Sequence, residues 1–142
     1  MSSIKVLFLC IHNSARSQMA EAYLKKLGGD KFLPESAGLE PGKLNPLVVE
    51  AMKQEGIDIS KNKTKDVFEM HRQGKSFDYV ITVCDPKSSE MCPIFPGIQK
   101  KINWGFDDPS KFAGSKEEKI AQTKIIRDKI KKAVQDFILE TE

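Results

Sequence analysis

The sequence predicts an α/β fold, a three-layer sandwich in which a four-stranded parallel sheet carries helices on both faces. Short, almost wholly apolar runs, typical of strands covered on both sides, alternate along the chain with segments of helical periodicity. No linker, repeat or low-complexity segment divides the 142 residues. A single domain over residues 1–142 is therefore expected.

Four segments are expected to form the strands. The run from Ile4 to Cys10 (IKVLFLC) is nearly continuous in apolar residues, and Tyr79 to Val83 (YVITV) is a second buried strand. Phe32 to Ala37 is weaker, and its Pro34 predicts the edge of the sheet, because proline lacks an N–H donor. A short strand around Lys101 to Trp104 completes the set.

Capping residues mark the helices between and after the strands. Asn45 is a plausible N-cap with Pro46 at the first helical position. Thr64 is expected to cap a shorter helix, and Ser115 with Glu118 forms a capping box for the last one. The first helix follows the polar stretch after the first strand, and it has no such cap.

Composition excludes several classes of function. Lys and Arg outnumber Asp and Glu by 23 to 20, and acidic residues are interspersed among the late basic ones, so no nucleic-acid partner is expected. The longest purely apolar run has six residues, from Val6 to Ile11, which is far below the roughly 20 that span a bilayer. No signal peptide is visible, and a cytoplasmic monomer without a membrane partner is expected.

The three cysteines, Cys10, Cys84 and Cys92, are an odd number. In a chain without a secretory signal, this count argues against a framework of structural disulfides. Reactive or buried thiols are the expected alternative.

The most informative segment joins the first strand to the first helix. It places the thiol of Cys10 six residues before the guanidinium of Arg16. Such a turn points backbone N–H groups inward at a helix N-terminus, and the guanidinium adds a planar fork for two oxygens of a tetrahedral anion. The predicted anion-binding loop comprises Ile11, His12, Asn13, Ser14, Ala15 and Arg16.

The same positive field favours the thiolate form of Cys10, which makes it a nucleophile near neutral pH. Ser17 is placed to hydrogen-bond that thiolate. The alternative is a buried structural Cys10 with Arg16 paired at the surface. Placement directly after a buried strand and before a helix without a cap favours the functional interpretation.

Two further polar clusters follow other strands and therefore fall at the same edge of a parallel sheet. Cys84 ends the strand at Tyr79 to Val83, with Cys92 eight positions later. Asp107-Asp108-Pro109 follows the last strand. Turn chemistry alone is an alternative explanation for Asp-Asp-Pro.

Several motifs together resemble a known family. Cys10-x5-Arg16-Ser17 with a late Asp108-Pro109 resembles the low-molecular-weight protein tyrosine phosphatases. The longer matches resemble the thioredoxin-coupled arsenate reductases built on that fold; they are Asn13 to Glu21, Ser36-Ala37-Gly38, Gly56 to Ser60 and Trp104 to Pro109. The resemblance covers nearly the whole chain and implies the low-molecular-weight phosphatase fold.

The resemblance also implies roles. Cys10 attacks arsenate, Arg16 and Ser17 stabilise the anion and the thiolate, and Asp108 protonates the departing oxygen, while Asp107 is a turn or charge-tuning residue. Cys84 and Cys92 then relay a disulfide outward to a thioredoxin-like protein, so that arsenate leaves as arsenite. Thioredoxin is the implied electron donor, with glutaredoxin and glutathione as the alternative, and no tightly bound cofactor is expected.

Two other functions stay open at this point. A phosphatase uses the same Cys10, Arg16 and Asp108 and needs no further thiols. A redox-sensing or anion-binding regulatory module would bind the anion without turnover. The family's phosphatases carry an aromatic residue soon after the proline, whereas Ser110-Lys111 follow here, which favours the reductase.

The segment from Cys84 to Cys92 has to be a loop or to unfold during turnover. One continuous helix would separate the two Cα atoms by about 12 Å, whereas a disulfide needs roughly 4.4 to 6.8 Å. His12 stands where many relatives have glycine, so a positive φ there would be strained. It is expected to be a residue at the rim of the site, with a catalytic base as the alternative.

Some relatives bind a potassium ion beside the anion loop. The matching oxygen ligands in this sequence are Asn13, Glu21, Ser36 and Asp66. The alternative is that Asn13 holds the loop and Glu21 is an ordinary helix residue. No spacing of cysteine and histidine typical of zinc is present in the sequence.

Overall fold

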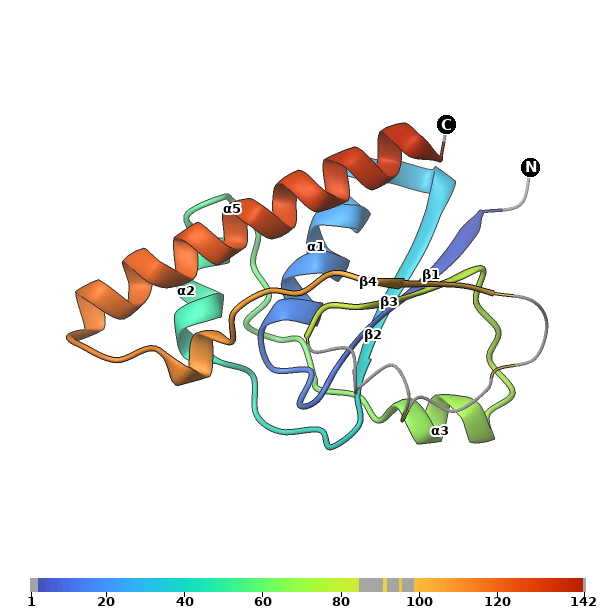
Figure 1. The fold of residues 1–142 in the computed structure, drawn as a ribbon, viewed down its shortest axis with the longest axis horizontal. Helices are drawn as coiled ribbons and strands as arrows, with labels where there is room; N and C mark the ends of the chain where they lie inside the picture. Colours follow the sequence, from blue (N-terminus) through green and yellow to red (C-terminus); the bar gives the residue numbers. More distant parts are fainter. Residues whose placement is uncertain (1–2, 85–90, 92–94, 96–98, 142) are drawn as a thin grey trace.

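The computed structural model describes residues 3–84, 91, 95 and 99–141. Its sheet has four parallel strands in the order β2-β1-β3-β4 (Figure 1). The strands are β1 (Ile4–Cys10), β2 (Phe32–Gly38), β3 (Tyr79–Thr82) and β4 (Lys100–Asn103). The four predicted strands are confirmed, and β2, which contains Pro34, lies at an edge as expected.

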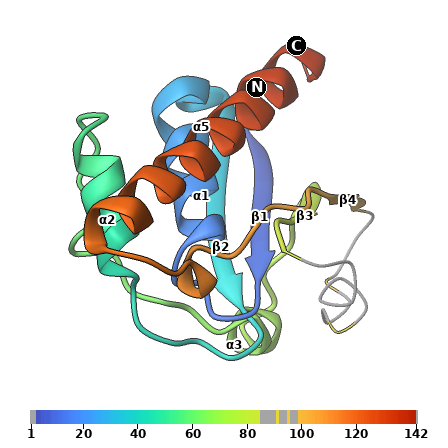
Figure 2. The same cartoon turned by 60° about the vertical axis from the view of Figure 1, so that its left-hand side comes forward.

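Helices cover both faces of the sheet (Figures 1 and 2). Helices α1 and α5 pack against each other on one face, and α3 lies on the other. The helices are α1 (Arg16–Gly28), α2 (Pro46–Lys53), α3 (Val67–Arg72) and α5 (Lys116–Glu140), with short 3₁₀ turns η1 (Gly29–Lys31) and η2 (Pro109–Lys111). The predicted three-layer α/β sandwich is confirmed.

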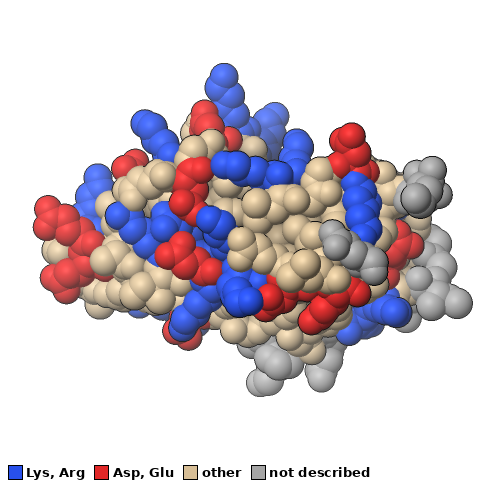
Figure 3. All heavy atoms as spheres, turned by 90° about the horizontal axis from the view of Figure 1, so that it is seen from above, with Lys and Arg blue, Asp and Glu red and all other residues tan. Residues whose placement is uncertain are grey.

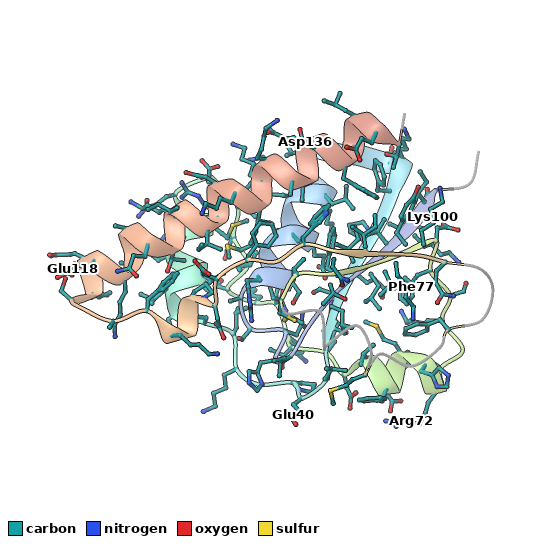
Figure 4. The ribbon with its side chains drawn as sticks, in the orientation of Figure 1. Glu40, Arg72, Phe77, Lys100, Glu118 and Asp136 are labelled. Atoms are coloured by element: carbon teal, nitrogen blue, oxygen red, sulfur yellow. The ribbon has the colours of Figure 1, made fainter. Side chains whose placement is uncertain are left out.

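The apolar run of β1 explains these layers. Successive side chains of a strand point to opposite faces. Val6 and Phe8 therefore enter the core beneath α1 and α5, whereas Leu7 and Leu9 enter the core beneath α3, and all four are fully buried. Phe77, labelled in Figure 4, belongs to the second of these cores.

The predicted caps are confirmed for two helices and wrong for one. The side chain of Asn45 accepts a hydrogen bond from the N–H of Leu47, and the capping box at the start of α5 is complete. Helix α3 is capped by Asp66 and not by Thr64. The hydroxyl of Thr64 instead donates to the carbonyl of Gly42 at 2.6 Å, so a contact distant in sequence removes it from the helix.

Basic and acidic side chains are interspersed on the face shown in Figure 3. Such a mixture of charges is typical of an ordinary solvated surface. Within residues 3–84 and 99–141, no helix is long and apolar enough to cross a membrane.

Candidate active site

The loop after β1 is held by a segment that runs beside it. Backbone N–H groups of residues 39–45 donate to four carbonyls on the outer side of the loop. The bonds are Leu39 to Cys10 (3.1 Å), Glu40 to Ile11 (2.8 Å), Gly42 to His12 (3.0 Å) and Asn45 to Ser14 (2.9 Å). Because the C=O and N–H of one trans peptide point in opposite directions, this pairing leaves the N–H groups of the loop to face an anion.

Two residues allow the close approach of segment and loop. A Cβ on Gly38 would lie 2.6 Å from the carbonyl oxygen of Ile11 and 2.9 Å from the nitrogen of Asn13, so only glycine fits. Asn13 takes the positive φ of the loop, at 54°. His12 therefore does not carry the strain of a positive φ, because the position with positive φ is taken by Asn13, and asparagine tolerates this conformation.

The sulfur of Cys10 is buried and faces two hydrogen-bond donors. The N–H of Asn13 donates to it at 3.1 Å, and the hydroxyl of Ser17 lies 2.9 Å away. The side-chain amide of Asn13 donates to that hydroxyl oxygen at 2.8 Å, which leaves the hydroxyl proton to point at the sulfur. Two donors directed at one sulfur stabilise a thiolate.

The orientation of Asn13 is fixed from outside the loop. Its Oδ1 accepts from the backbone N–H of Lys65 at 2.9 Å and from the amide of Gln18 at 3.1 Å. A backbone N–H is an unambiguous donor, so it assigns the oxygen of this amide and leaves the NH₂ group for Ser17. Asn13, Ser17 and Gln18 are all buried.

Helix α1 begins directly behind the loop, and its first turn has no side-chain cap. Its N–H groups and the positive end of its dipole thus remain available to an anion. Arg16, the first residue of α1, donates to the carbonyl of Phe106 at 3.0 Å and lies 3.6 Å from the carboxylate of Asp108. These contacts bring two of the predicted catalytic residues, Arg16 and Asp108, together across 92 positions of sequence.

A pocket of about 440 Å³ opens at this point, at the carboxyl end of the sheet. Its lining includes Arg16, Cys84, Asp107 and Asp108, together with Ile11 of the loop and Lys111 of η2. Cys84 is buried, and its sulfur lies 4.0 Å from the carbonyl oxygen of Leu9, the residue before Cys10. The structure therefore brings one of the two predicted relay thiols to the anion loop.

Two of the predicted site features have other outcomes. Cys92, and most of the segment between it and Cys84, lie outside the described residues. His12 is exposed, and its Nδ1 lies 2.9 Å from the carbonyl oxygen of Glu40, which is labelled in Figure 4. Since a carbonyl only accepts, Nδ1 carries the proton, and the ring fastens the rim of the loop to the neighbouring segment.

Two of the four predicted potassium ligands, Glu21 and Asn13, contact Lys65. Glu21 accepts from the hydroxyl of Ser36 at 2.7 Å and from the ammonium of Lys65 at 3.0 Å. Asn13 is occupied as described above, and Asp66 accepts from the N–H of Phe68 as the cap of α3. Each of the four side chains thus already has an oxygen that faces a donor or is itself a donor, and an ammonium lies beside Glu21, so these residues as placed do not fit a metal ion.

Sequence reasoning missed the supports of the loop. Segment 39–45, Gln18 and Lys65 carry no motif of their own, because their roles depend on contacts distant in sequence. One signal was present: Gly38, in Ser36-Ala37-Gly38, is a glycine at the end of a strand, which is typical of close backbone approach.

Fold and site together define a class of protein, one in which a loop at the carboxyl end of a parallel sheet places a cysteine beside backbone N–H groups and an arginine. Residues 5–142 match the family described as low molecular weight phosphotyrosine protein phosphatase, and the chain belongs to this family.

Within that family, the chain is similar to arsenate reductases. It is 42% identical to arsenate reductase of Bacillus subtilis over 132 residues, 93% of each chain, and 42% identical to that of Halalkalibacterium halodurans over 137 residues, 96% of each. A solved arsenate reductase in the oxidized state superposes with a TM-score of 0.80 at 28% identity, covering 97% of this chain and 98% of that one. The resemblance predicted from the sequence is confirmed.

Proposed function

We propose that this protein reduces arsenate to arsenite through a disulfide relay. One observation carries the proposal: Cys84 lines the same pocket as Arg16 and Asp108, beside the loop that activates Cys10. A phosphatase needs only Cys10, Arg16 and Asp108. A second thiol at this place supplies what reduction needs, an attacking group for a sulfur that has bound the substrate.

In the first step, the thiolate of Cys10 attacks arsenic within the anion loop. A sulfur–arsenic bond forms, and one arsenic–oxygen bond breaks as Asp108 protonates the departing oxygen, which leaves as water. Arg16 and the loop N–H groups hold the remaining oxygens. The incoming anion competes with Asp108 for Arg16, so the ion pair at 3.6 Å gives way when substrate binds.

In the second step, the thiolate of Cys84 attacks the sulfur of Cys10. A sulfur–sulfur bond forms, the sulfur–arsenic bond breaks, and its electron pair reduces As(V) to As(III), which leaves as arsenite. Cys92 then attacks Cys84, and the resulting Cys84–Cys92 disulfide is reduced by a dithiol donor. We assign that donor to the thioredoxin class, because a solved neighbour is a thioredoxin-dependent arsenate reductase of Corynebacterium glutamicum (TM-score 0.64, 29% identity, covering 94% of this chain and 62% of that one).

On this proposal the protein acts as a monomer in the cytoplasm, where dithiol donors are kept reduced. It needs an oxyanion and a thioredoxin-like partner, and no tightly bound cofactor. Another solved arsenate reductase is in a phosphate-binding state (TM-score 0.74, 28% identity, covering 98% of this chain and 99% of that one), which supports the view that the loop suits phosphate as well as arsenate.

The test is arsenate-dependent oxidation of NADPH with thioredoxin and thioredoxin reductase. Wild type is expected to turn over, Cys10→Ser and Cys84→Ser to show none, and Ser89→Ala, outside the three thiols, to match wild type. Hydrolysis of p-nitrophenyl phosphate without arsenate turnover would instead assign the protein as a phosphatase. Turnover only with glutathione and glutaredoxin would keep the reaction and change the donor.

A further inference from the structure

Lys65 occupies the centre of the cluster behind the anion loop with both its side chain and its backbone. Its ammonium lies 3.0 Å from Glu21 of α1, and its backbone N–H donates to Asn13 of the loop at 2.9 Å. Its carbonyl accepts from the N–H of Gly38 at the end of β2 at 2.8 Å. One residue thus joins the first helix, the edge strand and the anion loop.

The charge of this cluster is balanced within the chain. The side chain of Glu21 is only 17% exposed, and the ammonium of Lys65 and the hydroxyl of Ser36 share one of its carboxylate oxygens. A carboxylate with so little exposure needs a partner, because losing its hydration is costly. Lys65 supplies that partner as a covalent part of the chain.

We propose that Lys65 is the built-in cation of this site: its ammonium stands where a monovalent metal ion would bind beside Glu21, while its backbone N–H holds Asn13, which contacts the sulfur of Cys10. The link to Cys10 rests on the function proposed above. The path of hydrogen bonds starts at the backbone N–H of Lys65 and runs to Asn13 (2.9 Å), to Ser17 (2.8 Å) and to the sulfur (2.9 Å). The protein is therefore independent of potassium, unlike relatives that bind the ion.

The charge of the cluster also acts on the sulfur directly, and its sign gives a test. Without the ammonium, Glu21 is an unbalanced negative charge that disfavours a thiolate. Without the carboxylate, Lys65 is an unbalanced positive charge that favours one. Removing the two partners therefore shifts the reactivity of Cys10 in opposite directions, whereas general loosening of the structure shifts it in one direction.

The experiment measures the rate of alkylation of Cys10 by iodoacetamide at neutral pH, with the modified peptide quantified by mass spectrometry. Lys65→Met is expected to slow alkylation about threefold. Glu21→Gln is expected to speed it, and the double variant to lie near wild type. Equal rates for wild type and Lys65→Met, or changes of the same sign in both single variants, would overturn the proposal.

Potassium is the second arm. With potassium chloride in place of tetramethylammonium chloride at equal ionic strength, Lys65→Met is expected to regain alkylation rate and melting temperature, while wild type does not respond. Lys75→Met is the matched control, since Lys75 is also 38% exposed and pairs with Glu35 of β2 at 2.7 Å, away from the loop. A response of wild type, or no recovery of Lys65→Met, would refute the substitution of lysine for a metal ion.

Neither readout requires arsenate turnover. If wild type failed to reduce arsenate, the proposed function would be wrong, and the comparison of Lys65→Met with Lys75→Met would still decide this inference.

Discussion

Asn13 shows how much of the site depends on the backbone angle and hydrogen bonds of one residue. Its positive φ shapes the loop, its N–H contacts the sulfur of Cys10, and its amide directs the hydroxyl of Ser17 toward the same sulfur. The spacing of Cys10, Asn13 and Arg16 made the loop predictable, since all of its residues are neighbours in sequence. Lys65 and Gln18 were not predictable, because a side chain that acts on Asn13 from another segment leaves no local pattern.

Replacing Asn13 by aspartate tests the direction of these hydrogen bonds. Aspartate has nearly the same shape but cannot donate, so the hydroxyl of Ser17 turns toward it and away from Cys10. We expect kcat/KM to fall about tenfold to a hundredfold, the effect of losing a hydrogen bond to a charged group. Steady-state kinetics with arsenate measure it, and Asn62→Asp, on the far side of Gln18, is the control. Equal losses in both variants would contradict this role of Asn13.

Gly38 tests the close contact between loop and segment 39–45. In Gly38→Ala, the added Cβ meets backbone atoms, which cannot rotate away as a side chain can. We expect unfolding by urea to show a loss of about 1–3 kcal/mol. Gly105→Ala, where a Cβ meets nothing within 4 Å, is expected to change stability little. Similar stability of the two variants would count against the packing described here.

At the scale of elements, the start of a helix was predicted correctly where one capping residue stands alone. It was predicted wrongly where two capping residues compete for the same helix. Asn45 with Pro46, and Ser115 with Glu118, act within one turn of their own helix, and both starts are confirmed. Thr64 and Asp66 are both good caps for α3. The choice between them depends on the carbonyl of Gly42, which the fold places beside Thr64.

The capping box of α5 has a measurable value. This helix packs against α1 and α2 and buries Ile126, Ile130 and Phe137 in the core on one face of the sheet. We expect Ser115→Ala to lower the free energy of unfolding by about 1 kcal/mol, because an N–H in the first turn loses its partner. Glu118→Gln retains an acceptor for the box and is expected to cost less. Chemical denaturation of both variants measures the difference, and a larger loss in Glu118→Gln would exclude the capping explanation.

At the scale of the whole molecule, alternation along β1 was enough to predict two cores and three layers. It was not enough to predict how the helices are tied together. Tyr23 of α1 donates to Glu55, which follows α2, and Lys131 of α5 donates to the same carboxylate oxygen. These three groups are far apart in sequence, and none belongs to a motif.

These hydrogen bonds to Glu55 predict that the stability of the protein depends on pH in the alkaline range. Burial, and then the hydrogen bond to Glu55, raise the pKa of Tyr23 well above its ordinary value of 10. The folded state therefore holds this proton more tightly than the unfolded state, so the contribution of Tyr23 is complete below about pH 10 and is lost as pH rises further. We expect Tyr23→Phe to lose less stability than wild type above that pH in urea unfolding. Tyr79→Phe, which keeps Tyr23, should follow wild type; equal slopes in all three proteins would refute the tie.

The same carboxylate predicts an effect in acid. Hydrogen bonds from Lys131 and then Tyr23 lower the pKa of Glu55 below its ordinary value. Its contribution is therefore present above about pH 4.3 and is lost as pH falls through the lower, folded-state value. We expect Glu55→Gln to flatten the acid side of the stability profile, measured by thermal melting between neutral and acid pH. An unchanged acid slope would place the effect on other carboxylates.

The central claim is that the sulfur of Cys10 binds the arsenic and that Cys84 then attacks this sulfur, which forms a Cys10–Cys84 disulfide and releases arsenite. A single turnover with Cys92→Ser, without any electron donor, tests this most directly, because the relay then has to stop after its second step. We predict one arsenite released per protein molecule and a Cys10–Cys84 disulfide found by peptide mass spectrometry. Release of no arsenite, or arsenite without that disulfide, would contradict the account.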